Sequence, residues 1–281
     1  MNTKTVAITG ATSGIGRETA KGLFKQGFHL ILLARNLNKA RELRDQLLST
    51  NKNGHIHIYH CNLADLNSVK TAADEIIANH QQLHILLNNA GGIFPKKECS
   101  EQGYEITFAV NHLGHFILTK KLLGLLHSSK AGVINVSSNA YKFANAELDD
   151  IMFEEHDYSA IRAYANAKLF NIWFTREIHQ RYNNEGIKSF ALHPGVVKTG
   201  FGKDYQGFAG FLLGLFRPFM ISASKGAQTS LFLSVANDKT DSDSGKFFTK
   251  KHPTSTNKMA QDEKKARQLW DLSEKMISLY L

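Results

Sequence analysis

The strongest constraint on the fold is a regular alternation of continuously apolar runs with segments of helical period. Few polar residues interrupt the apolar runs, which is typical of parallel strands buried on both faces. These runs are residues 5–9, 29–34, 55–60, 84–88, 132–137 and 188–193, with a shorter one at 245–249. Helical periodicity occupies residues 15–27, 37–49, 66–79, 104–126, 160–183, 224–236 and 261–278. This order predicts right-handed crossovers and therefore an α/β protein, a doubly wound parallel sheet of about seven strands with helices on both faces.

The domain organisation follows from the length and from the segments between the predicted elements. The 281 residues contain no repeat, low-complexity linker or shift in composition, so we expect one domain over residues 1–281. Two cysteines, Cys61 and Cys99, support no disulfide framework and favour a reducing compartment, hence a cytoplasmic location. The net charge of +9 comes mostly from scattered basic residues, and we expect no nucleic-acid partner.

Two segments of the sequence are candidates for membrane or substrate contact, the N-terminus and the apolar stretch at 207–221. The N-terminal sequence MNTKTVAITG lacks the long apolar run of a signal peptide or anchor. The longest apolar stretch, residues 207–221, is too short for an ordinary spanning helix and is interrupted by Arg217 and Pro218. Its place after the sixth strand predicts a substrate lid around residues 200–223. Peripheral membrane contact through 207–221, or packing on the core or on a second copy in a homo-oligomer, stays open.

A glycine-rich turn, TGATSGIG, follows the first predicted strand. Gly10, Gly14 and Gly16 open the next helix, where backbone amides and the helix dipole favour a pyrophosphate. Strand, turn and helix in this order predict a dinucleotide site, although glycines alone also suit an ordinary turn. Where a carboxylate at the end of the second strand would bind the ribose of NAD, the chain has Ala34 and Arg35. The Arg35 guanidinium suits a 2′-phosphate, so NADP(H) is predicted over NAD(H).

Three further strand ends carry candidate contacts to such a cofactor. Asn62, after the third strand, offers an amide oxygen to the adenine amino group. The sequence NNAG at 88–91 brings small residues to the ribose, although Asn and Gly are also common in turns. The sequence HPGVVKT after the sixth strand offers a backbone amide and a threonine hydroxyl to the nicotinamide carboxamide.

Tyr164 and Lys168 stand four residues apart in YANAK, which places both on one face of a helix. By spacing alone such a pair is most often a surface contact. A nearby ammonium and an oxidised nicotinamide would each lower the tyrosine pKa from its usual value of about 10. With the glycine turn and Ser138 at the end of a strand, we interpret Tyr164 as a general acid and base.

Together these residues resemble the short-chain dehydrogenase/reductase family over nearly the whole chain. The matching motifs are TGATSGIG, NNAG, VNHLGH, VSS, YANAK and HPGVVKT, in that order. The sequences VNHLGHFILT, INVSS, HPGVVKTG and GAQTSL are similar, more narrowly, to its retinol-dehydrogenase-like branch. The resemblance implies a Rossmann-like NADP(H)-binding fold that interconverts a lipophilic alcohol and its aldehyde or ketone by hydride transfer.

The resemblance also implies roles for individual residues. Tyr164 would exchange the proton, Ser138 would bind the substrate oxygen, and Lys168 would bind the nicotinamide ribose and lower the tyrosine pKa. Asn111 would fix a water that passes protons from Lys168 to solvent, and Ser137 would be a neighbour only. The implied cofactor-binding residues are Gly10, Thr12, Ser13, Gly14, Ile15, Gly16, Arg35, Asn62, Leu63, Asn89, Ala90, Gly91, Tyr164, Lys168, Pro194, Gly195, Val197 and Thr199. The chain departs from the family at Asn62-Leu63, where Asp-Leu is usual, and in lacking the N-terminal membrane segment of some animal relatives.

Other interpretations of the same residues remain. His112 and His115 have a spacing that metal ligands use, but no cysteine or carboxylate set accompanies them, so we expect structural roles and no metal. A non-catalytic NADP(H)-binding sensor would use the same fold but would need no Asn–Ser–Tyr–Lys set. A reductase of small polar carbonyls would differ from the leading prediction in its dependence on substrate chain length.

Overall fold

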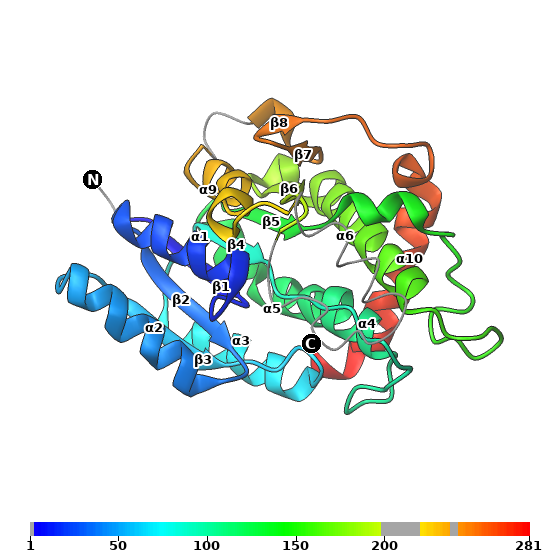
Figure 1. The fold of residues 1–281 in the computed structure, drawn as a ribbon, viewed down its shortest axis with the longest axis horizontal. Coiled ribbons are helices and arrows are strands. Elements are labelled where there is room, and N and C mark those ends of the chain that lie inside the picture. Colours follow the sequence, from blue (N-terminus) through cyan, green and yellow to red (C-terminus); the bar gives the residue numbers. More distant parts are fainter. Residues whose placement is uncertain (1–2, 198–219, 237–240) are drawn as a thin grey trace.

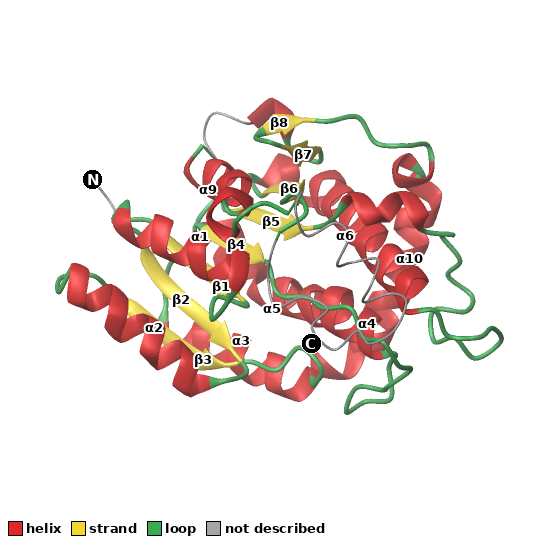
Figure 2. Ribbon diagram, in the orientation of Figure 1, coloured by secondary structure: helices red, strands yellow, loops and turns green. Residues whose placement is uncertain are grey.

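The computed structural model describes residues 3–197, 220–236 and 241–281. Its strands form one sheet in the order β3-β2-β1-β4-β5-β6-β7-β8 (Figure 2). The strands are β1 (Thr5–Thr9), β2 (His29–Ala34), β3 (Ile56–His60), β4 (Ile85–Asn88), β5 (Gly132–Val136), β6 (Lys188–His193), β7 (Phe247–Thr249) and β8 (His252–Pro253). All neighbouring strands are parallel except β7 and β8. The predicted fold class is therefore confirmed.

The parallel register brings the carboxyl ends of the seven strands β1 to β7 to one edge of the sheet. Ala34 of β2 pairs with His60 of β3, and Asn88 of β4 pairs with Asn135 of β5. The strand order reverses between β1 and β4, because β1 leads to β2 on one side and β4 leads to β5 on the other. Ligands of such sheets bind at the carboxyl edge near this reversal, so the fold itself indicates where to look for a site.

Two layers of helices cover the sheet (Figure 1). The longer helices are α1 (Gly14–Lys25), α2 (Leu37–Thr50), α3 (Leu66–Asn79), α5 (Gly114–Ser128), α6 (Ala160–Tyr182), α9 (Gln228–Val235) and α10 (Glu263–Ile277). Helices α1, α2 and α9 share one buried apolar cluster with the sheet, and α3, α5, α6 and α10 share the other. The strands contribute alternate residues to the two clusters, as a sheet buried on both faces requires.

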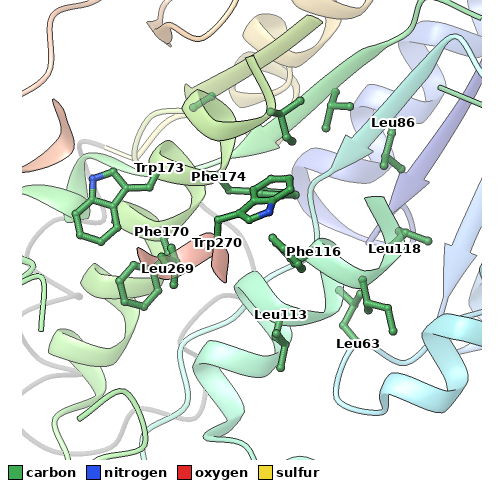
Figure 3. Close-up of a cluster of buried hydrophobic side chains, with 14 of the residues drawn as sticks. Leu63, Leu86, Leu113, Phe116, Leu118, Phe170, Trp173, Phe174, Leu269 and Trp270 are labelled. Atoms are coloured by element: carbon green, nitrogen blue, oxygen red, sulfur yellow. The ribbon is translucent and has the colours of Figure 1, made fainter. Parts of the chain in front are cut away.

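Aromatic packing holds α10 against α5 and α6 (Figure 3). The rings of Phe116, Phe174 and Trp270 meet with centroids 4.9–5.9 Å apart. Such pairs each add about 0.5–1.5 kcal/mol beyond the burial of their area. The C-terminal helix therefore stabilises two of the helices that cover one face of the sheet.

Three sequence expectations need correction. The helix expected over 104–126 is divided into α4 (Ile106–Phe108), a π-helical turn (Ala109–Leu113) and α5, because the Gly114 amide bonds to the Ala109 carbonyl five residues back. The helix expected over 224–236 is divided into α8 (Ala223–Gly226) and α9. The sheet has an eighth strand, β8, whose two residues pair only at the antiparallel edge. No helix of the described residues is both long enough and apolar enough to cross a membrane.

Candidate active site

The glycine-rich turn after β1 is closed by backbone conformations and contacts that exclude side chains. Gly10 and Gly14 have φ of +70° and +53°, a region that residues with a Cβ rarely adopt. A Cβ on Gly16 would overlap the Gly10 carbonyl oxygen and the Asn89 side-chain nitrogen. Ser13 is the N-cap of α1 and its side chain makes no capping hydrogen bond. The turn therefore presents the first amides of α1 at the carboxyl edge of the sheet.

The turn after β4 is tied to the end of β1. The Asn89 and Ala90 amides each donate to Thr9 Oγ1 at 3.0 Å, and Asn89 Nδ2 donates to the Thr9 carbonyl at 2.8 Å. Gly91 follows, and a Cβ there would lie 2.5 Å from Asn111 Oδ1 and 3.2 Å from Lys168 Nζ. The predicted NNAG segment thus lies between the glycine turn and two of the predicted catalytic residues.

Asn111 is fully buried in the π-helical turn, a feature often found at functional sites. Its Nδ2 donates to the Gly92 carbonyl at 2.9 Å and to the Thr107 carbonyl at 2.8 Å. Its Oδ1 accepts from the Gly92 amide at 3.2 Å. The side chain therefore holds the chain after β4 in place, and it borders Lys168 through Gly91.

The two serines after β5 differ in their contacts. Ser137 is buried and donates to the Lys168 carbonyl at 2.6 Å, which anchors α6 to the strand end. Ser138 caps the 3₁₀ turn Asn139–Phe143 by accepting from the Ala140 amide at 3.2 Å. Its side chain also makes a hydrogen bond with Tyr164. Ser138, rather than Ser137, therefore faces the tyrosine.

Tyr164 and Lys168 lie on one face of α6, which starts at the Ser159 cap. Lys168 Nζ is 5.3 Å from the centre of the Tyr164 ring and donates to the Val136 carbonyl at 3.1 Å. Burial lowers the pKa of Lys168 to about 7. Burial also raises the pKa of Tyr164, and the hydrogen bond with Ser138 opposes that rise. Of the effects that this chain's own groups have on the Tyr164 pKa, the raising effect of burial is larger than the lowering effect of the Ser138 hydrogen bond.

The segment after β6 returns to the glycine turn. Gly195 has φ of +94°, and the Ile221 amide bonds to the Val196 carbonyl at 2.8 Å. A Cβ on Gly226 would lie 2.6 Å from Val197 Cγ2 and 3.3 Å from Ile15 Cγ1, so Val197 lies close to α1. Thr199 and most of the expected lid over 200–223 are outside the described residues, as is nearly all of 207–221.

An open hollow of about 500 Å³ lies where β2 and β3 end. Its lining is Arg35, Asn36, Leu37, Asn38, Arg41 and His60. Two guanidinium groups and an imidazole line this hollow, and among the described residues no carboxylate does. Sequence reasoning found Arg35 but missed Arg41 and His60, although the pairing of neighbouring parallel strands indicates His60.

Asn62 and Leu63 follow β3 and prepare the next helix. Asn62 Oδ1 accepts from the Ala64 amide at 3.3 Å, a bond within its own turn that leaves a second lone pair on the oxygen. Leu63 is buried, and its carbonyl is 2.8 Å from the position that a Cβ on Gly114 would take. Whether Asn62 contacts an adenine stays a prediction.

The two histidines of the NHLGH segment are buried and have different partners. His112 Nε2 pairs with Ser273 of α10 at 3.0 Å, whereas His115 Nε2 pairs with Thr9 at 2.9 Å. Burial lowers the pKa of each to about 3. The described residues contain no group of three or more His, Cys, Asp or Glu side chains arranged to hold a metal ion.

Comparisons with known proteins agree with this geometry. The family model of the short chain dehydrogenases matches residues 4–207. Retinol dehydrogenase 12 of Bos taurus is 35% identical over 277 residues, which cover 98% of this chain and 87% of that protein. Retinol dehydrogenase 13 of Homo sapiens is 36% identical over 282 residues, covering 98% and 85%.

Solved structures show the same fold. An uncharacterized protein from Mycobacterium paratuberculosis superposes with a TM-score of 0.75 at 27% identity, covering 98% of this chain and 93% of that one. An alcohol dehydrogenase from Thermococcus sibiricus complexed with 5-hydroxy-NADP gives a TM-score of 0.64 at 21% identity, covering 83% and 90%. The family match and the full-length relatives lead to one conclusion: the chain belongs to the short-chain dehydrogenases, oxidoreductases that bind a nicotinamide cofactor.

Proposed function

We propose that the protein is an NADP(H)-dependent oxidoreductase that interconverts a lipophilic alcohol and its aldehyde or ketone. The observation that carries the proposal is the Ser138–Tyr164–Lys168 arrangement beside Gly91 and Asn111, at the carboxyl edge of a dinucleotide-binding sheet. The names of the relatives, retinol dehydrogenases 12 and 13, support an alcohol and carbonyl pair as substrates.

The residues of the turns fit a dinucleotide. Gly10, Gly16 and Gly91 let the turns pack closely against Ala90, Asn89 and Asn111 with no side chain between them, and the amides of α1 lie at the same edge of the sheet. When bound there, the nicotinamide supplies or accepts the hydride. Lys168 lies within reach of Gly91 and the strand ends, where it would bind ribose hydroxyls.

In this proposal Tyr164 is the residue that exchanges a proton with the substrate oxygen. In reduction its hydroxyl gives a proton to the carbonyl oxygen, and in oxidation it takes the proton of the alcohol. Ser138 would hydrogen-bond the same oxygen and stabilise the charge that develops on it. Because burial raises the pKa of Tyr164, the phenol holds a proton at neutral pH that it can give to a carbonyl oxygen.

The preference for NADP(H) rests on the hollow after β2. Arg35 and Arg41 offer forked donors to a 2′-phosphate, and no carboxylate in the described part of the chain lines the hollow to bind a free 2′-hydroxyl. A phosphate adds two charges that these guanidinium groups would pair with, whereas NADH leaves them without that contact.

The lipophilic substrate is supported by exposed apolar side chains near the proposed catalytic pair. Phe143, Ile161 and Val196 are 76%, 62% and 56% exposed. Phe143 ends the turn that Ser138 caps, Ile161 lies one helical turn before Tyr164, and Val196 follows Gly195. Large apolar side chains exposed around a site favour contact with an apolar molecule.

The test is cofactor consumption by purified protein with retinal, decanal and a short polar aldehyde, each with NADPH and with NADH. We expect turnover with NADPH that increases with the apolar size of the carbonyl. Arg35→Ser should raise the KM for NADPH about tenfold or more, the effect of one charge-assisted hydrogen bond, and leave the KM for NADH unchanged.

Arg44→Ser is the matched control, because Arg44 lies on α2, the helix that follows Arg35, pairs with Asp45 and does not line the hollow. A wild-type preference for NADH, or equal effects of Arg35→Ser on both cofactors, would contradict the NADP(H) assignment. NADPH binding without turnover of any carbonyl would instead favour the cofactor sensor. Preference for the short aldehyde would favour a reductase of polar carbonyls.

A further inference from the structure

We propose that His115 is a positioning residue that joins Asn111 to the two cofactor-binding turns. The inference rests on the proposed function, because it concerns how that site is assembled. His115 is almost fully buried at the start of α5 and contacts Thr9 of β1, 106 residues away in the sequence. Its hydrogen bonds go to Thr9 and to the Asn111 carbonyl, so its effect would pass through these two residues.

The contacts of Thr9 fix the direction of its hydrogen bond with His115. Thr9 Oγ1 already accepts from the amides of Asn89 and Ala90, each at 3.0 Å. A hydroxyl has two acceptor lone pairs and one proton, so the remaining contact must use that proton. The candidates are His115 Nε2 at 2.9 Å and the Leu87 carbonyl at 3.4 Å. The shorter contact assigns the proton to the bond with His115, whose Nε2 is therefore the acceptor.

The tautomer of His115 follows from this assignment. A neutral imidazole that accepts at Nε2 carries its proton on Nδ1. That nitrogen lies 3.3 Å from the Asn111 carbonyl, to which it donates. Burial keeps the ring neutral by lowering its pKa to about 3, the charge of Lys168 lowers that pKa further, and the hydrogen bond to the Asn111 carbonyl opposes this by raising it.

The result is one directed series of hydrogen bonds across three segments. It runs from the amides after β4 to the Thr9 hydroxyl at the end of β1, then to His115, and on to the Asn111 carbonyl in the π-helical turn. Every donor and acceptor of the His115 ring is used, so an apolar side chain would leave the Thr9 proton and the Asn111 carbonyl without this partner. A displacement of Asn111 would then reach Gly92, to which it is hydrogen-bonded, and Gly91, which lies beside Lys168.

His112 provides a matched control within the same segment. It is as deeply buried as His115, has its pKa lowered to the same value, and also bonds to a hydroxyl. Its partner, however, is Ser273 of α10, and its ring packs among Phe108, Phe116 and Phe174, away from the turns. Replacing either histidine by leucine removes a buried polar group, but only one replacement affects the series.

The experiment compares His115→Leu, His115→Gln and His112→Leu in the full chain, measuring kcat, the Kd for NADPH by fluorescence, and Tm. Glutamine offers one acceptor to Thr9 and one donor to Asn111, so it should restore part of the function. We expect His115→Leu to lower kcat and weaken NADPH binding by about tenfold each, and His112→Leu to shift mainly Tm. His115→Gln should lie between His115→Leu and the wild type.

The inference would be overturned if His115→Leu and His112→Leu lost kcat and NADPH affinity equally, in proportion to their decrease in Tm. It would also be overturned if kcat and the Kd for NADPH were unchanged in His115→Leu. The test does not depend on the substrate assignment. If the wild type turns over no carbonyl, the proposed function fails, while the NADPH titration still decides whether His115 supports the turns and His112 does not.

Discussion

The proton on Tyr164 is governed by opposing effects from its neighbours. Burial raises its pKa, and the Ser138 hydrogen bond lowers it. Burial also lowers the pKa of Lys168 to about 7, so near neutral pH this lysine is charged in only part of the molecules. An anionic or polar cofactor beside Lys168 would favour its charged form and thereby the phenolate. The acid–base behaviour of the pair is therefore expected to depend on cofactor binding.

Removing the phenolic oxygen tests the assignment of Tyr164. Tyr164→Phe keeps the ring and its packing but has no proton to give, so turnover should fall by at least about 10²-fold while NADPH binding stays within about twofold. Steady-state kinetics and fluorescence titration measure the two quantities.

Tyr158→Phe is the control for this variant. The Tyr158 hydroxyl donates to the Phe94 carbonyl at 2.8 Å and lies 3.3 Å from Glu105, a structural network. Its loss should reduce stability and leave most of the turnover. Turnover retained by Tyr164→Phe would rule out the proposed proton transfer.

At the scale of elements, the contact between the glycine turn and α1 depends on the missing side chain of Gly16. A methyl group there would overlap the Gly10 carbonyl oxygen and the Asn89 amide. Gly16→Ala should therefore weaken NADPH binding and lower the free energy of unfolding by about 1–3 kcal/mol, although alanine is the better helix former. Urea unfolding and NADPH titration measure both effects.

Gly124→Ala is the matched control, because Gly124 lies on exposed α5 surface and a Cβ there meets nothing within 4 Å. That variant should raise the free energy of unfolding by about 0.5–1 kcal/mol and leave NADPH binding unchanged. If Gly16→Ala and Gly124→Ala changed the free energy of unfolding and NADPH binding alike, the close contact at Gly16 would contribute to neither.

Local signals in the sequence predicted most elements. Helix α3 begins and ends at the expected residues, 66 and 79, because Asp65 caps it and its apolar residues follow one stripe. The π-helical turn at 109–113 was not predicted, because periodicity does not say which carbonyl an amide will bond to. Strand β8 was missed because two residues, one of them Pro253, carry no pattern.

Short sequence motifs predicted those residues of the candidate site that lie within the motifs themselves. Ser138, Tyr164 and Lys168 are brought together, and Gly91 lies beside Asn111 and Lys168. The roles of Arg41, His60 and His115 depend on contacts between distant segments, which a single sequence does not give. How strongly burial raises the Tyr164 pKa could not be predicted, because desolvation depends on the packing around α6.

At the scale of the whole molecule, neutral histidines are buried in or beside the core. Burial lowers the pKa of His112 and His115 to about 3 and that of His193 to about 4. These values lie below the usual 6.5, so the unfolded chain binds more protons than the folded one at mildly acidic pH. The stabilising effect is complete above about pH 6.5 and is lost as the pH falls toward the folded values.

Acid should therefore unfold the protein through these side chains. Each should lower the free energy of unfolding by about 1.4 kcal/mol per pH unit below 6.5, or about 2 kcal/mol by pH 5. Glu105, whose pKa is raised by burial, acts in the opposite direction. The lowered pKa values of Asp74 and Glu274 add further losses of unfolding free energy at still lower pH.

Urea unfolding followed by circular dichroism at pH 7, 6 and 5 measures how steeply the free energy of unfolding depends on pH. His112→Leu should reduce that slope by about one proton, and a free energy that is flat between pH 7 and 5 would show that the buried histidines do not control acid stability.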